Sequence, residues 1–112
     1  MHNFKELKIW KLGMDISMKT YYISKNFPED KRFGLVSQIR RCAISIPSNI
    51  TEGSGRGTNA DFNRFVDYSL ASSFELETQL LLANDLFGID ISDILGTVSE
   101  SQRMTIGFEK TL

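Results

Sequence analysis

The sequence contains one cysteine, one histidine and two prolines in 112 residues. A single cysteine, Cys42, excludes an internal disulfide and any multi-cysteine metal site. The one histidine, His2, lies beside the N-terminus, so we expect no histidine to activate a nucleophile. We therefore expect no catalytic site, no metal site and no cofactor, and we interpret Cys42 as a small core residue rather than a nucleophile.

Long apolar runs are also missing. No segment approaches the ~20 apolar residues of a membrane span. The N-terminal segment MHNFKELKIWK lacks the apolar core of a signal peptide, so we expect a cytoplasmic protein without membrane contact. A chain of 112 residues fits one domain, here residues 1–112.

The net charge of -1 conceals an uneven distribution. Residues 1–56 carry ten basic and five acidic side chains, a net charge of +5, whereas residues 57–112 carry three basic and nine acidic side chains, a net charge of -6. Such an asymmetry fits a nucleic-acid-binding face, complementary packing between subunits, or two solvated surfaces of opposite bias.

Apolar side chains recur with the helical period in four segments. We expect helices over residues 4–26, 33–52 and 59–87 and from about residue 92 onward. Thr58 is expected to cap the third helix near Asp61, and Gly88 to end it. Gly96 and Gly107 weaken the last helix and leave its length open. Four helices joined by short turns predict an all-α fold, an antiparallel up-down four-helix bundle.

The first and third helices carry more apolar side chains than one core requires. In the first, a stripe containing Trp10, Met14 and Tyr21 is expected to face the core, while isoleucines occupy the opposite side. The surplus faces predict a homo-oligomer, because a monomer would expose them. The side chains expected in the oligomer interface are Ile9, Leu12, Ile16, Ile23, Ile44, Tyr68, Leu82 and Leu86.

Residues 40–58, RRCAISIPSNITEGSGRGT, combine a proline with three alternate glycines. The glycines lack the Lys-Ser/Thr ending of a P-loop, the GxGxxG spacing and a preceding strand. We therefore interpret them as a chain reversal that uses positive φ values. Pro47 removes a backbone donor and crowds the carbonyl of Ala43, which predicts a kink or break; Ser45 and Ser48 are placed to rebond freed backbone groups.

Polar side chains interrupt the apolar arcs of the second and third helices. Asn49, Ser73 and Glu77 are expected to form a structural network, bonding one another or the backbone around Pro47. A catalytic role for Glu77 is the alternative, but Glu75 and Glu77 face different sides of one helix and make no acid–base pair.

Five basic side chains are candidate contacts to the phosphates of a nucleic acid. The alternative is that they pair with acidic residues of the same or a neighbouring subunit. The five are Arg40, Arg41, Arg56, Lys8 and Lys11.

Three segments, in order, resemble the bacterial four-helix-bundle proteins called 23S ribosomal RNA intervening-sequence proteins: FKELKIWK, FPEDKRFGLVSQIRRCAISIPSNITEGSGRGT and DFNRFVDYSLASSFELETQLLLA. The most specific part is QIRRCAISIPSNITEGSGR followed by SSFELETQL. The resemblance implies an antiparallel bundle that assembles as a homopentameric ring and is not an enzyme. A related branch, the accessory variability determinants of diversity-generating retroelements, is associated with reverse transcriptases and binds nucleic acid.

The resemblance assigns signature roles in fold and assembly to Gln38, Arg40, Arg41, Ser45, Asn49, Glu52, Gly53, Arg56, Ser73, Glu75 and Glu77. The accessory variability determinants are strongly basic, whereas this chain has a pI near 5.8. A ring of such subunits would be net negative, which weakens nonspecific attraction to phosphate. The first hypothesis is therefore a non-catalytic oligomeric scaffold that presents a surface to a macromolecular partner such as a protein. The second is direct RNA or DNA binding through a local basic patch, as an accessory to a reverse transcriptase.

Overall fold

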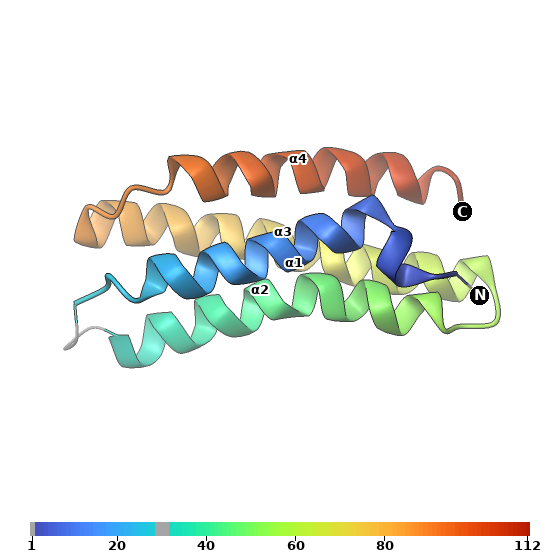
Figure 1. Cartoon of the computed structure of the whole chain (residues 1–112), viewed down its shortest axis with the longest axis horizontal. Helices are drawn as coiled ribbons and strands as arrows, with labels where there is room; N and C mark the ends of the chain where they lie inside the picture. Colours follow the sequence, from blue (N-terminus) through green and yellow to red (C-terminus); the bar gives the residue numbers. More distant parts are fainter. Residues whose placement is uncertain (1, 29–31) are drawn as a thin grey trace.

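Four α-helices and no strand make up residues 2–28 and 32–112, the part of the chain that the computed structural model describes (Figure 1). This confirms the all-α prediction. Glu29 and Asp30, which follow the first expected helix, lie outside the described residues. The elements are a 3-10 turn η1 (Phe4–Glu6), α1 (Lys8–Ser24), α2 (Arg32–Ser54), α3 (Asn59–Phe87) and α4 (Ser92–Glu109).

Both ends of α3 follow the local signals in the sequence. The Thr58 hydroxyl accepts a hydrogen bond from the backbone N–H of Asp61 at 3.1 Å. Gly88 ends the helix in the left-handed conformation, with a φ of 67°, where a side chain would be strained. Both predictions are confirmed. α4 continues through Gly96 and Gly107, because packing of a buried face outweighs the weak helix propensity of glycine.

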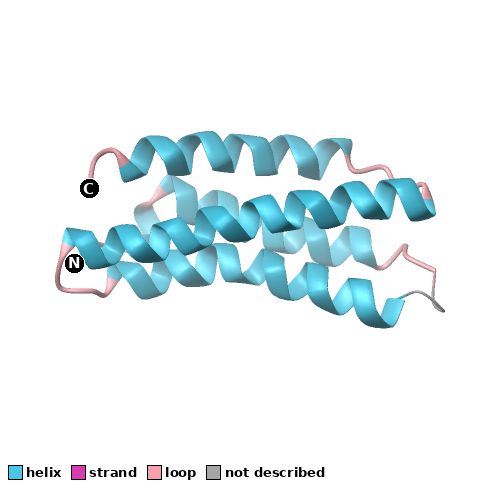
Figure 2. Cartoon of the chain, turned by 180° about the vertical axis from the view of Figure 1, so that it is seen from behind, coloured by secondary structure: helices cyan, strands magenta, loops and turns pink. Residues whose placement is uncertain are grey.

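The helices lie side by side along the long axis of a molecule of 45 × 22 × 19 Å (Figures 1 and 2). Each helix packs against the next, and α4 packs against α1. Among the described residues, α1 and α3 have no Cα atoms within 8 Å of each other, and neither have α2 and α4. α1 and α3 are therefore diagonal, so their outward faces point to opposite sides. No helix in this part of the chain has the length and apolarity to cross a bilayer.

The core consists of two apolar clusters that share the interior of the bundle. The larger contains Ile16, Ile39 and Leu80, and the smaller, near the two termini, contains Ile50 and Phe62. Burial of each such side chain contributes about 1.5 to 3 kcal/mol to folding. Residues of α1, α2 and α3 contribute to both clusters, so these three helices are fixed along most of their length.

The core-facing side of α1 is the opposite of the predicted one. Ile9 and Ile16, expected in the oligomer interface, are 3% and 0% exposed in the single chain, so they have no surface left for a second subunit and that prediction is wrong for them. Leu12 and Ile23 are half-buried. Both stripes of α1 are apolar, so the helical period alone could not show which of them faces the core. The isoleucine stripe faces inward because it includes Gly13, which lets α1 approach α2 closely.

Gly53 acts through close packing rather than through a turn. It lies inside α2, and among the described glycines only Gly88 has a positive φ. The predicted positive φ values in the reversal are therefore wrong. A Cβ atom on Gly53 would lie 2.7 Å from Cβ of Phe65 and 2.8 Å from Cδ1 of Phe62. The absent side chain lets α2 approach α3 closely.

Candidate interaction surfaces

The α1–α2 contact at Pro47, here called the proline crossing, joins Gly13 and Ser17 of α1 to Ala43 and Pro47 of α2. α2 continues unbroken through Pro47, which leaves the Ala43 carbonyl without its intrahelical donor. Ser17 Oγ lies 3.1 Å from that carbonyl oxygen and 2.9 Å from the Gly13 carbonyl oxygen, so its single proton is shared between these two acceptors. A Cβ on Gly13 would lie 3.1 Å from the Pro47 nitrogen. The donor to this carbonyl thus comes from α1, and Ser45 instead bonds the Cys42 carbonyl.

The three polar residues expected to form a network do not bond one another. Asn49 Nδ2 donates to the Ser45 carbonyl at 2.8 Å, beside Pro47, as one of the predicted alternatives had it. Ser73 Oγ donates to a carbonyl of its own helix, and Glu77 accepts from Gln102 Nε2 of α4 at 2.8 Å. Sequence reasoning missed that bond to Gln102. It also missed Ser69, whose buried hydroxyl donates to the Ile46 carbonyl at 2.8 Å.

Two of the candidate phosphate contacts are engaged within the chain. Arg40 Nε donates to Ser24 Oγ at 2.8 Å, and its guanidinium stacks 4.4 Å from the ring centre of Tyr21. Arg56 pairs with Glu52 at 3.3 Å and lies 4.5 Å from the ring centre of Phe65. The Arg56–Glu52 pair matches the alternative interpretation, pairing with an acidic residue of the same subunit. Ser24 and Tyr21, which Arg40 contacts, are not acidic.

The remaining candidates, Lys8, Lys11 and Arg41, are exposed. Arg40 lies within α2, and Arg56 follows the last residue of α2, Ser54, by two positions. The helical rise from Arg40 to Ser54 alone is about 21 Å. The five basic residues therefore do not form one compact patch.

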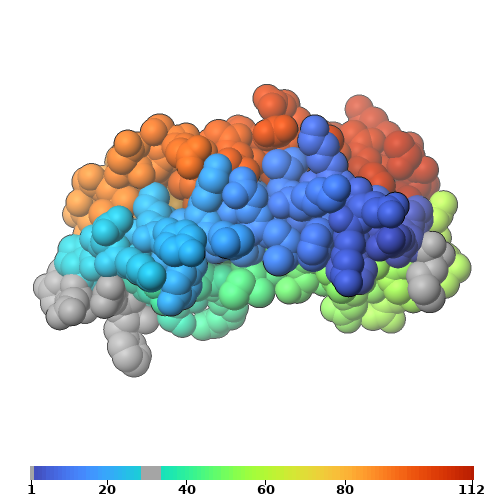
Figure 3. Space-filling view, viewed as in Figure 1, coloured from blue at the N-terminus to red at the C-terminus, as the bar shows by residue number. Residues whose placement is uncertain are grey.

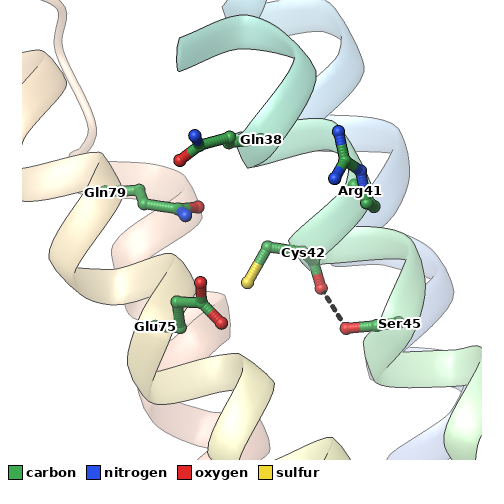
Figure 4. Close-up of a pocket in the computed structure, with 6 residues that line it drawn as sticks. All are labelled: Gln38, Arg41, Cys42, Ser45, Glu75 and Gln79. Atoms are coloured by element: carbon green, nitrogen blue, oxygen red, sulfur yellow. Dashed lines mark hydrogen bonds between the residues drawn. The ribbon is translucent and has the colours of Figure 1, made fainter. Parts of the chain in front are cut away.

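Arg41 lines a polar cleft between α2 and α3, here called the α2–α3 groove (Figure 4). The groove has a volume of about 400 Å³. Gln38 and Gln79 extend toward each other from the two helices, and the Glu75 carboxylate points toward Cys42 (Figure 4). The residues that line it are Gln38, Arg41, Cys42, Ser45, Glu75 and Gln79. They come from the two segments that carry the most specific part of the family resemblance.

The groove contains charged and polar groups that are not paired across it. Arg41 Nη2 bonds Ser37 on its own helix, and no ion pair joins Arg41 to Glu75 in the described structure. Gln79 is only 8% exposed, yet its buried Oε1 has no hydrogen-bond donor. A buried acceptor without a donor costs about 1 to 3 kcal/mol.

Cys42 contributes a neutral thiol to the groove. Its Sγ donates to the Ser72 carbonyl at 3.1 Å. Burial, reinforced by the Glu75 carboxylate, raises the pKa of Cys42 to about 12. The thiolate is the nucleophilic form of cysteine, so this residue is inert near neutral pH. The groove therefore offers hydrogen bonds and two opposite charges, but no activated nucleophile from Cys42.

Exposed apolar side chains form two faces on diagonal helices. The α1–α2 apolar face surrounds a shallow groove of about 280 Å³ and consists of Met14, Met18, Tyr21, Tyr22 and Ile44, all 41% to 59% exposed. The α3 apolar face consists of Tyr68, Phe74, Leu81, Leu82 and Leu86. Figure 3 shows the side of the molecule that α1 covers, between α4 and α2. The α1 and α3 side chains of these two faces lie on diagonal helices that do not touch each other in the described structure.

These features define an all-helical four-helix bundle. Its surface has two exposed apolar faces and one polar groove, the α2–α3 groove. Residues 5–107 match the 23S rRNA-intervening sequence protein family, and the chain belongs to this family. The resemblance inferred from the sequence is confirmed.

A solved structure has the same fold. It is a protein of unknown function from the S23 ribosomal protein family of Bacteroides thetaiotaomicron VPI-5482, determined at 1.70 Å resolution. The TM-score is 0.82 at 24% sequence identity, covering 91% of this chain and 98% of that chain. No match was found among curated proteins.

Proposed function

We propose that this protein is a non-catalytic, homo-oligomeric scaffold, an antiparallel up-down bundle that presents a surface of its assembly to a macromolecular partner. The observation that carries the proposal is that one chain exposes two separate apolar faces, one on α1 and α2 and one on α3. Exposed apolar patches of this kind mark sites of association. The family resemblance implies five copies in the assembly, a homopentamer.

The α1–α2 apolar face of one copy meets the α3 apolar face of the next in this proposal. Two different apolar faces on one subunit favour such a heterologous contact, which can repeat around a closed ring. Charge favours the same arrangement, because residues 1–56, which include α1 and α2, carry +5 and residues 57–112, which include α3 and α4, carry -6. Opposite charges on approaching faces promote association and set its orientation.

The test uses one substitution on each face, Met18→Glu and Leu82→Arg, with Ser99→Glu on the exposed side of α4 as control. Each face variant should give a monomer by light scattering, while the control keeps the wild-type mass. Mixing the two variants should restore a single contact and give a 1:1 heterodimer, because each supplies the face that the other lacks.

The mixing experiment also separates the possible contact geometries. If like faces met around a two-fold axis, only one of the two variants would dissociate, and mixing would not produce the 1:1 complex. A wild-type mass equal to one chain at every concentration would overturn the proposal.

The second candidate function is RNA or DNA binding, favoured by the net positive charge of residues 1–56 and by exposed Arg41, Lys8 and Lys11. Phosphate contacts weaken steeply as salt rises, because binding releases counterions. A mobility shift that is lost at high salt and reduced in the triple alanine variant of these three residues would support this candidate. Failure to shift any nucleic acid at low salt would remove it.

A further inference from the structure

We propose that the α2–α3 groove binds a small zwitterion, a free amino acid with a carboxamide side chain. The ligand carboxylate lies at Arg41, its ammonium group at Glu75, and its carboxamide between Gln38 and Gln79. Every residue of this site belongs to a single chain, so the inference does not depend on the proposed assembly.

The spacing of the lining residues makes the groove a continuous site. Gln38, Arg41 and Ser45 recur along one stripe of α2, and Glu75 and Gln79 lie one turn apart on α3. At about 1.5 Å rise per residue, the α2 stripe is about 10 Å long. A ligand the size of an amino acid fits this length and the volume of about 400 Å³.

The unpaired Gln79 side chain points to a ligand with hydrogen-bond donors. Its Oε1 is buried at the groove and has no donor in the described structure. Water or a polar ligand normally completes such a group, because proteins rarely leave buried acceptors unbonded. A primary carboxamide has both donors and an acceptor, and so can pair with the carboxamides of Gln38 and Gln79.

The two charges select the rest of the ligand. Arg41 and Glu75 line the same groove without forming an ion pair with each other. A guanidinium binds a carboxylate by two parallel hydrogen bonds, and a carboxylate binds an ammonium group by charge-assisted ones. A polyanion would meet repulsion from Glu75, so the groove discriminates against phosphate chains. The Cys42 thiol adds no charge that would disturb this balance.

L-Glutamine is the probe for the test, titrated into the full chain while backbone and side-chain amide resonances are followed by NMR. Saturable shifts are expected at the side-chain amides of Gln38 and Gln79. Arg41→Gln and Glu75→Gln each remove one charge at similar size, and each should weaken binding by about tenfold or more. The matched controls, Arg103→Gln and Glu100→Gln on α4, should bind as the wild type does.

Two modified ligands test the assignment of each charge. N-Acetyl-L-glutamine lacks the ammonium group, and L-glutamine amide lacks the carboxylate. Each should bind the wild type more weakly than L-glutamine does. The loss on acetylation should disappear in Glu75→Gln, and the loss on amidation should disappear in Arg41→Gln.

Either of two results would overturn the inference: no saturable shift with millimolar L-glutamine, or binding that Arg41→Gln and Glu75→Gln leave unchanged. Light scattering on the same samples reports separately on assembly. A groove variant that changes the mass of the particle but not the affinity for L-glutamine would assign the groove to subunit contacts instead.

Discussion

The two long sides of α2 are built in opposite ways. At the proline crossing the contacting residues are small, and the carbonyl freed by Pro47 accepts from Ser17. In the α2–α3 groove the side chains are long and polar, and the buried Oε1 of Gln79 has no donor.

The difference separates a structural contact from a binding site on one helix. Natural proteins bond their buried polar groups, and exceptions concentrate where a ligand or partner completes them. At the proline crossing, the Ala43 carbonyl that Pro47 leaves without an intrahelical donor accepts a hydrogen bond from Ser17 of the same chain. In the groove, no group of the described chain donates to the buried Oε1 of Gln79.

The largest expected effect is on the reactivity of Cys42. Its pKa is raised from 9.0 to about 12 in the folded chain, so its thiolate fraction at about pH 8 is roughly a thousandfold lower than in the unfolded chain. Alkylation by iodoacetamide, followed by mass spectrometry, should be slower by a similar factor in native protein than in denaturant. Comparable rates in the two states would contradict the inert thiol inferred for the groove.

The same pKa shift gives a pH dependence of stability with a definite sign. The folded state holds the Cys42 proton more tightly than the unfolded state does. The contribution of the protonated Cys42 thiol to the free energy of unfolding is therefore fully present below about pH 9. It is lost as the pH rises toward 12. In Cys42→Ala this part of the alkaline loss should be absent when urea unfolding is measured across the same pH range.

Added bulk should affect the two sides of α2 differently. Gly13→Leu should lower the free energy of unfolding by about 3 kcal/mol, because its side chain would meet Pro47 backbone atoms that cannot move aside. Gln38→Leu adds an apolar side chain in the groove, where Gln38 is exposed, and should change stability by less than about 0.5 kcal/mol. Urea unfolding monitored by circular dichroism measures both. Equal decreases in the free energy of unfolding for the two variants would mean that the proline crossing and the α2–α3 groove are packed equally tightly.

Local signals in the sequence predicted most of the fold but little of these contacts. Thr58 and Gly88 fix the ends of α3 through groups within a few residues, so sequence patterns suffice there. The inward face of α1 was predicted wrongly, because two apolar stripes compete and only the close approach at Gly13 decides between them. That approach depends on Pro47, thirty-four positions further along the chain.

Only part of the α2–α3 groove could be predicted from the sequence. Gln38, Arg41, Ser45 and Glu75 were all singled out as signature positions, but Gln79 was not. Nothing in the helical period shows that position 38 on α2 and position 79 on α3 line the same groove. Their side chains meet only because α2 and α3 pack along most of their length.

The Ser17 hydroxyl at the proline crossing should matter only while Pro47 is present. Ser17→Ala should cost about 1 kcal/mol, because the Ala43 carbonyl loses its donor. In a Pro47→Ala background, residue 47 regains its backbone N–H and can bond that carbonyl within α2. The cost of Ser17→Ala should then fall toward zero. Ser48→Ala, at an exposed position, is the control, and an unchanged cost in both backgrounds would show that Ser17 acts by another route.

The smallest expected effect is at Gln79. Replacing an unpaired buried amide by an apolar side chain of similar size removes no hydrogen bond, so Gln79→Leu should change the free energy of unfolding by less than about 0.5 kcal/mol or raise it slightly. Ser69→Ala, by contrast, breaks a buried bond of 2.8 Å and should cost about 1 kcal/mol. If Gln79→Leu were as destabilising as Ser69→Ala, Gln79 would serve the fold. A stable variant that no longer shifts with L-glutamine would show that the buried amide serves the ligand.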